Sequence, residues 1–161
     1  MNKTEKLTLK SDKLYINEVE RFVEQICDEF NIYNNYYANI LLSVTEAYTN
    51  AVEHGNHYDE NKSVNIKFSS ESNGLTFSIE DEGDGYEIDK IPDPTDIKNE
   101  GVEGRGLFMI NSLADQVELE NNGSKIKLQF LISSINREMA NKRNSLFHQY
   151  INQDVKKEQM H

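Results

Sequence analysis

Apolar residues recur along the chain at two different periods, and each period predicts one kind of element. Strict alternation of apolar and polar positions predicts strands at 6–10, 64–68, 75–79, 117–119 and 126–132. The strands after the first come in two consecutive pairs. Such pairs are typical of hairpins, in which neighbouring strands run antiparallel.

Apolar residues spaced three and four positions apart predict helices at 14–30, 36–54 and 107–114. The sequence ESNG at 71–74 and the pair Asn122-Gly123, a type I′ signal, favour hairpin turns between the paired strands. The order of elements therefore predicts an α/β (α+β) two-layer sandwich. Its sheet would be mixed but mostly antiparallel, with the helices on one face.

The chain is long enough for one domain with its own core, which we place at residues 1–132. Residues 133–161 are a polar extension that we expect to be partly helical or disordered. Residues 86–103 have no clean periodicity and contain both prolines. A loop of this length inside a compact domain is usually functional or disordered.

The acidic balance limits the classes of partner. With 28 acidic and 17 basic residues the net charge is −11, which opposes non-specific binding to nucleic acid or to anionic membrane surfaces. A nucleotide stays compatible, because Mg²⁺ can bring the missing positive charge. No apolar run is long enough to span a bilayer and none resembles a signal core, so we expect a cytoplasmic protein. The single cysteine, Cys27, falls on an apolar helical position and is expected to be a buried thiol.

The stretch 41–55, LLSVTEAYTNAVEHG, combines an apolar helix face with a polar one. Glu46, Asn50 and His54 recur at every fourth position and would share the polar face. Carboxylate and carboxamide oxygens one turn apart suit Mg²⁺ and a polarised water. The simpler alternative is an ordinary amphipathic helix with solvated polar residues, which Gly55 would end.

A second motif, Asp81-x-Gly83-x-Gly85, follows a predicted strand directly. Its glycines would let the backbone approach a flat ligand closely, and the carboxylate could accept a hydrogen bond from an exocyclic amine such as that of adenine. A plain acidic turn is the alternative. A calcium loop is disfavoured, because Pro92 stands where an EF-hand needs its last glutamate.

The third motif, Gly101-x-x-Gly104-Arg105-Gly106, precedes a predicted helix and has the composition of a phosphate cradle. Arg105 could reach a terminal phosphate, although a flexible linker with a solvated arginine is the alternative. The motif is not a dinucleotide fingerprint, because no strand comes immediately before it. It is not a P-loop either, because no Gly-Lys-Ser/Thr follows.

Taken together and in this order, the three motifs resemble the ATP-binding fold shared by gyrase, the Hsp90 chaperone, histidine kinases and MutL, known as the GHKL superfamily. The chain looks most like the small anti-sigma-factor serine/threonine kinases of bacterial partner-switching systems. The phrase EAYTNAVEHG at 46–55 and the runs IPDPT at 91–95 and GRGLFMINSLAD at 104–115 are the most specific parts. The resemblance covers about residues 7–132.

The resemblance implies a role for each motif. Glu46 would be the general base for a substrate hydroxyl, and Asn50 would ligate Mg²⁺ that bridges the phosphates of ATP. Asp81 would bind the adenine amine, with Gly83 and Gly85 letting the ring lie against the backbone.

The same resemblance assigns the third motif to the phosphates. Gly104, Arg105 and Gly106 would wrap the β- and γ-phosphates, with Gly101 and Leu107 flanking them, and Arg105 would stabilise charge on the transferred group. Residues 86–103 would form the lid.

The implied function is a protein serine/threonine kinase that phosphorylates a small antagonist with a STAS-type fold. It would hold a sigma factor or another effector, and would act as a homodimer. One alternative is a non-catalytic, nucleotide-dependent anti-sigma or adaptor module. Glu46 speaks against it, because binding alone needs no base. Another alternative, a sensor histidine kinase fragment, is disfavoured because none of the four histidines has a dimerisation-helix setting.

Overall fold

The computed structural model describes residues 2–33, 35–85, 103–132 and 146–157, with only the backbone at 35 and 103–105. Five strands form one open sheet in the order β1-β2-β3-β5-β4, and all four pairings are antiparallel. The strands are β1 (Thr4–Lys10), β2 (Ser63–Glu71), β3 (Gly74–Glu80), β4 (Gln116–Glu120) and β5 (Lys125–Phe130).

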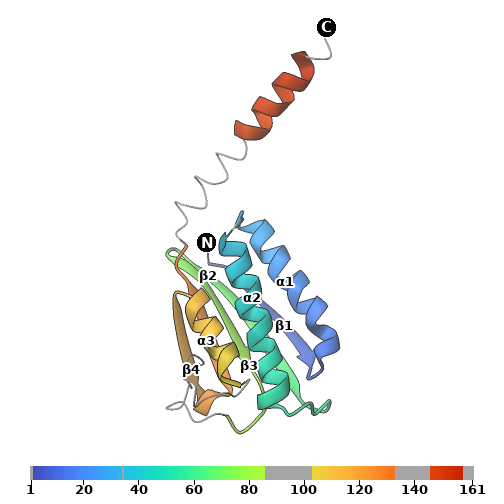
Figure 1. Cartoon of the computed structure of the whole chain (residues 1–161), viewed down its shortest axis with the longest axis vertical. Helices are drawn as coiled ribbons and strands as arrows, with labels where there is room; N and C mark the ends of the chain where they lie inside the picture. The colour runs from blue at the N-terminus through green and yellow to red at the C-terminus, as the bar shows by residue number, and fades with distance from the viewer. Residues whose placement is uncertain (1, 34, 86–102, 133–145, 158–161) are drawn as a thin grey trace.

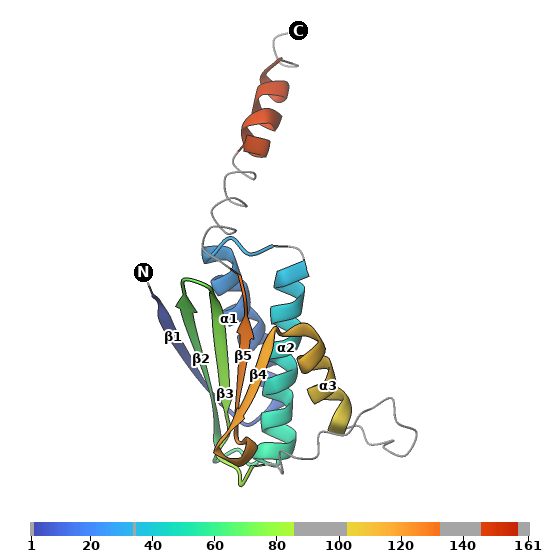
Figure 2. The same cartoon turned by 90° about the vertical axis from the view of Figure 1, so that its left-hand side faces the viewer.

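Three helices cover one face of this sheet, as Figures 1 and 2 show. They are α1 (Ile16–Glu29), α2 (Asn35–Asn50) and α3 (Glu103–Leu113). The other face of the sheet carries polar side chains, which explains the strict alternation along β2 and β5. The predicted two-layer sandwich is therefore confirmed, and its sheet is entirely antiparallel among the described strands.

A row of aromatic rings forms the part of the core under α1. Phe68 of β2 lies between Phe30 and Phe77, with ring centroids 5.4 and 5.1 Å away, and Phe77 contacts Phe130 of β5 at 6.3 Å. Phe68 is the direct partner of Phe77 across β2 and β3, whereas Phe130 is paired with Leu75, two residues from Phe77. Cys27 is also buried here, as expected.

Helix α2 is fixed to the start of the chain by the fully buried Tyr48. Its hydroxyl donates to the carbonyl oxygens of Lys10 and Asp12, at 2.9 and 2.7 Å. Burial raises the pKa of Tyr48 to about 12, so the phenol stays protonated and keeps both bonds. This contact fixes where the polar end of α2 lies relative to β1.

Three local predictions need correction. The central helix is not α-helical to residue 54, because α2 ends at Asn50 and a wider π-helical turn, Ala51–Gly55, follows. Helix α3 begins at Glu103 rather than after Gly106. The β4–β5 hairpin has a longer connection than a two-residue type I′ turn, with Asn121 and Asn122 at φ 53° and 58°.

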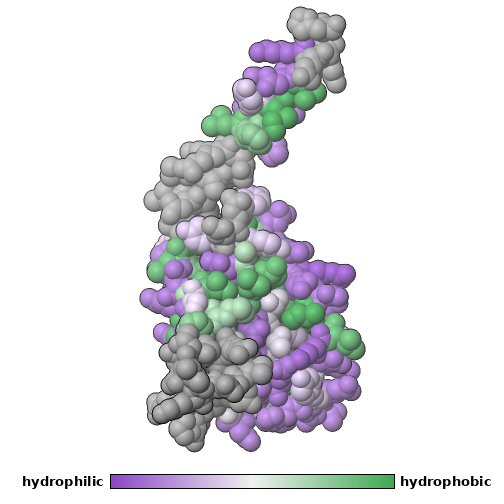
Figure 3. Space-filling model, in the orientation of Figure 1, coloured by the Kyte–Doolittle hydropathy of each residue, from purple (hydrophilic) through white to green (hydrophobic). Residues whose placement is uncertain are grey.

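Residues 146–157 form a further helix, and every one of its side chains is exposed. Figure 3 shows apolar atoms gathered along this helix and over α2 and α3. Within the described ranges no helix combines the length and the apolar character needed to cross a membrane.

Candidate functional site

The first and third sequence motifs meet at the end of α2. A methyl group placed on Gly106, in the first turn of α3, would lie 2.4 Å from Oε1 of Glu46 and 3.0 Å from Nδ2 of Asn50. A larger residue at 106 would therefore displace the carboxylate of Glu46 and crowd the carboxamide of Asn50. Glu46 and Asn50 are one α-helical turn apart, as predicted, whereas the π-helical turn takes His54 out of that regular spacing.

Glu46 is a half-buried carboxyl group with a raised pKa. Burial is the main cause, and the negative charge of Glu53 adds to it, while His54 and Lys13 act in the opposite direction. A carboxylate that holds its proton more tightly than usual is a stronger base once ionised. This is the property that a general base for a hydroxyl group needs.

Charged side chains around Glu46 form their own network at the surface. Lys13 forms an ion pair with Glu53, and its Nζ lies 5.6 Å from the centre of the Tyr58 ring. Glu53 also lies 3.6 Å from Nε2 of His54. His54 therefore belongs to the surroundings of Glu46.

The second motif lies against the same end of α2. Asp81 is buried at the end of β3, where its backbone N–H donates to Ser124 and its Oδ1 accepts the N–H of Gly83, both at 2.8 Å. A methyl group on Gly55 would lie 2.2 Å from Oδ2 of Asp81, and one on Gly83 would lie 2.0 Å from the oxygen of Gly55. The glycine predicted to end the helix thus also makes room for the carboxylate.

Burial raises the pKa of Asp81, and the Gly83 N–H partly opposes this by stabilising the ionised form. A carboxylate can accept several hydrogen bonds, so the bond to Gly83 leaves capacity for an exocyclic amine. Gly85 has φ +87°, and a methyl group there would lie 2.0 Å from the oxygen of Asn122. This glycine joins the motif to the β4–β5 hairpin.

Asn56 connects several parts of this site, and the sequence analysis did not single it out. It is buried, and its Nδ2 donates to Ser11 Oγ and, at 3.0 Å, to the oxygen of Ser63. Its Oδ1 accepts the N–H of Glu82 at 2.8 Å, next to Asp81. Its position directly after a helix-ending glycine is the one sequence signal that could have found it.

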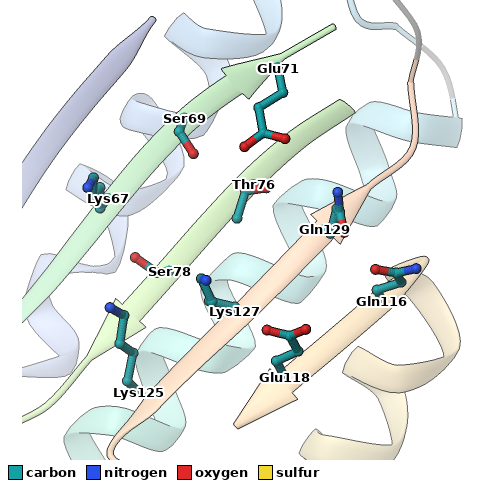
Figure 4. A pocket seen from close by; sticks show the side chains of 10 residues that line it. All are labelled: Lys67, Ser69, Glu71, Thr76, Ser78, Gln116, Glu118, Lys125, Lys127 and Gln129. Carbon is teal, nitrogen blue, oxygen red and sulfur yellow. The ribbon is translucent and has the colours of Figure 1, made fainter. Parts of the chain in front are cut away.

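Asn50, Asp81, Leu107 and Ser124 line one cavity between α2, α3 and β5. Its volume is about 20 Å³, roughly that of one water molecule, so an adenine ring requires the cavity to widen. Two larger hollows lie elsewhere: one between α1 and α2, and one on the polar sheet face shown in Figure 4. The latter is lined by Lys, Ser, Thr, Gln and Glu side chains of four strands and has none of the motif residues.

The donors at this site fit a nucleotide with Mg²⁺. The described residues contain no cluster of three or more His, Cys, Asp or Glu side chains that could hold a metal ion alone. A metal here would therefore share phosphate and water oxygens with Asn50. The first turn of α3 lies at this site, and the backbone N–H groups of a first helical turn have no partner within the helix. Such groups can donate hydrogen bonds to phosphate oxygens.

Some predicted site residues fall outside the description. Gly101 and the rest of the expected lid at 86–103 lie outside the described residues, except Glu103, which is the first residue of α3. Gly104 and Arg105 lie in the first turn of α3, where only the backbone is described. The arginine's predicted contact with the transferred phosphate stays a prediction.

The sequence is similar to one known protein family and to several named bacterial proteins. The model of a family described as histidine kinase-like ATPase domain matches residues 9–130. The serine-protein kinase RsbW of Bacillus subtilis is 33% identical over 93 residues, which cover 52% of this chain and 57% of the relative. RsbW of Halalkalibacterium halodurans is 25% identical over 130 residues, 76% of this chain and 79% of the relative.

The anti-sigma F factor of Clostridium perfringens is 28% identical over 118 residues, 70% of this chain and 76% of the relative. The match to the Bacillus subtilis and Oceanobacillus iheyensis kinases spans 57% of their length.

Proposed function

The chain belongs to the histidine kinase-like ATPase domain family, and we propose that it is an ATP-dependent protein serine/threonine kinase of a bacterial partner-switching system. The observation that carries the proposal is the contact of Gly106 with both Glu46 and Asn50. It brings the side chains that we propose as base and metal ligand next to the helix start that we propose to bind phosphates.

Each described residue has one task in the proposed transfer. Asp81 holds the adenine amine, and Gly83 keeps the backbone close to the ring. The N–H groups at the start of α3 hold the phosphates of ATP. Glu46 accepts the proton of the attacking hydroxyl as the γ-phosphoryl group moves to it, and ADP leaves. Arg105 stabilises the charge on that group.

Mg²⁺, when bound, would neutralise charge between the phosphates, with Asn50 as its protein ligand. Because catalysis of phosphoryl transfer is mainly positioning and electrostatics, the close packing around Gly106 is itself part of the mechanism. Displacement of Glu46 or Asn50 by a larger residue at 106 would disturb both tasks together.

The proposed substrate is a small antagonist protein with a STAS-type fold, phosphorylated on serine or threonine. The proposed held partner is a sigma factor or another effector in the cytoplasm, and the acting form is a homodimer. Three relatives described above support the kinase activity and the sigma-factor partner, since they are named serine-protein kinase RsbW or anti-sigma F factor. The STAS-type fold of the substrate and the homodimer follow from the family resemblance alone. Switching between the two partners requires that ATP and ADP favour them differently.

A non-catalytic module that binds a nucleotide and a sigma factor is the second candidate. It would need Asp81 and Asn50 but no base. The half-buried Glu46 with its raised pKa favours the kinase, because burial of a carboxyl group without a task only costs stability.

The deciding experiment measures transfer of labelled γ-phosphate from Mg-ATP to STAS-type proteins of the same genome. Glu46→Gln should lower transfer by about 10²–10⁴-fold, the usual contribution of a general base, with ATP affinity nearly unchanged. Glu53→Gln removes a neighbouring carboxylate instead and should keep transfer at neutral pH. The label should be acid-stable.

The other outcomes separate the candidates. ATP binding without label on any candidate protein would favour the non-catalytic module. Acid-labile label on histidine would favour a sensor-kinase fragment. Phosphate transfer at the full rate by Glu46→Gln would show that Glu46 is not the general base, while the protein could still be a kinase.

A further inference from the structure

The helix at 146–157 has an apolar side, and all its side chains are exposed within the part of the chain that the structure describes. Its large apolar side chains follow helical spacing and are 41–65% exposed. They are Leu146, Phe147, Tyr150, Ile151 and Val155. A helix this short is marginal in water unless its apolar face is covered.

The domain has an open groove of about 550 Å³ between α1 and α2. The buried Cys27 and Ile32 contribute apolar surface, and Tyr33 and Tyr37 line it as well. Charged side chains of α1 form its other edge, namely Arg21, Glu24 and Asp28. Apolar surface with a charged border is the usual form of a site for an amphipathic helix.

The distribution of charge favours the C-terminal segment of the same chain as the occupant of this groove. Residues 133–161 contain five basic and three acidic side chains, whereas residues 1–132 contain 12 basic and 25 acidic ones. The α1 sequence itself has one basic residue and five acidic ones. A mildly basic segment of the same chain is therefore attracted to an acidic helix.

The charges also match at single positions. Arg21 and Glu18 are three residues apart on α1, and so are Asp154 and Lys157 on the C-terminal helix. If that helix lies antiparallel to α1, Asp154 can face Arg21 while Lys157 faces Glu18. Leu146 then lies towards the end of α1, where Tyr33 borders the groove.

The connection is long enough. The chain leaves the sheet after β5, at the end of the domain where α1 ends and α2 begins (Figures 1 and 2). The thirteen residues 133–145 can span at most about 43–47 Å when extended. Tethering at this length gives an effective concentration on the order of millimolar, which favours the same chain over a second copy.

We propose that the helix at 146–157 docks in the α1–α2 groove of its own chain, with its apolar side chains against Cys27, Ile32 and Tyr37. The groove contacts the first turns of α2, whereas the candidate ATP site lies at the last turn. Docking is therefore independent of the proposed kinase activity.

Paramagnetic broadening in NMR spectra of the full chain tests this. A nitroxide placed through Asn152→Cys lies on the polar side of the helix. Burial raises the pKa of Cys27 to about 12, so that thiol stays unreactive at neutral pH. The amides of α1 from Arg21 to Asp28 should lose most of their intensity. Ile151→Asp should restore it, whereas Gln149→Asp, with the same charge on the polar side, should not.

A charge exchange sharpens the result. Arg21→Asp should weaken the broadening severalfold, and adding Asp154→Arg should recover it. The proposal is overturned if α1 is unaffected, or if broadening appears instead at Leu42 and Phe108, which are exposed apolar residues of α2 and α3. Mixing an isotope-labelled chain with a nitroxide-labelled one should give no broadening of α1. Broadening in that mixture would assign the groove to a second copy instead.

Discussion

The two ends of α2 are held in place by different kinds of contact. The first half of the helix buries Ile40, and Val44, one turn later, is also fully inaccessible to solvent. The last turn instead holds Glu46 and Asn50 against Gly106 and continues into a π-helical turn. One helix therefore serves as core at one end and as candidate site at the other.

The difference indicates that stability and chemistry are separable in this fold. Burial of apolar surface stabilises the first half, whereas burial of carboxyl groups at the other end is unfavourable, as their raised pKa values show. We therefore expect core substitutions to lower stability without changing the chemistry of the folded protein. Site substitutions should alter chemistry and can even raise stability.

The largest expected effect on stability is that of Phe68→Ala. The ring is fully buried between Phe30 and Phe77, so its removal leaves a cavity and should cost about 3–5 kcal/mol. Urea denaturation measures this, and Phe68→Leu, which fills more of the space, should cost less. ATP affinity of the folded protein should not change. A loss below about 1 kcal/mol, the level of a surface change, would contradict the proposed core.

Asn56→Ala has the next largest expected effect, and it should lower both the stability of the fold and the affinity for ATP. It would leave the N–H of Glu82 and the oxygen of Ser63 without their partner, at a cost of about 2–4 kcal/mol. Because the same bonds hold the turn after Asp81, ATP binding should weaken as well. Asn61→Ala, in the exposed part of the same turn, is the control and should alter neither. If Asn56→Ala destabilised the fold but bound ATP normally, the positioning role would be wrong.

Residues whose environment follows from local periodicity were predictable from the sequence. The alternation in β2 and β5 correctly gave the buried face of the sheet, and helical spacing gave the buried face of α1. Both depend on side chains two to four positions apart, so they need no knowledge of the tertiary fold. The positions of Glu46, Asn50 and Asp81 at the ends of elements followed in the same way.

Contacts between distant segments were not predictable. Asn56 is held by Ser11 and Glu82, 45 and 26 residues away, and no local pattern marks such partners. The π-helical turn depends on a single shift in hydrogen bonding, which leaves little trace in apolar spacing. Gly104 and Gly106 have poor helix propensity, so the sequence predicts a later start for α3. In the structure the helix already begins at Glu103, because tertiary contacts such as that of Gly106 with Glu46 override the local preference.

Asp81→Asn should raise the stability of the fold and lower its affinity for ATP. Burial raises the pKa of Asp81, so the ionised side chain is unfavourable in the fold, whereas asparagine is neutral and keeps an acceptor for the Gly83 N–H. The Tm should rise, by about 2–4 °C for each 1 kcal/mol gained. ATP affinity should fall by more than about tenfold, since a charged hydrogen bond is lost. The exposed Asp84→Asn is the control. Unchanged affinity would place the adenine site elsewhere.

The smallest expected effect is a shift in the pH dependence of phosphoryl transfer. Glu46 acts as a base only when ionised, so transfer should fall as the pH drops through its pKa. That fall should begin above the pH typical of an ordinary glutamate, because burial raises the pKa of Glu46. Glu53 contributes second to this shift, so Glu53→Gln should lower the pKa and move the acidic limb to lower pH. Single-turnover transfer rates across the acidic range measure both curves. A limb that stays in place or moves to higher pH would mean that another group controls it.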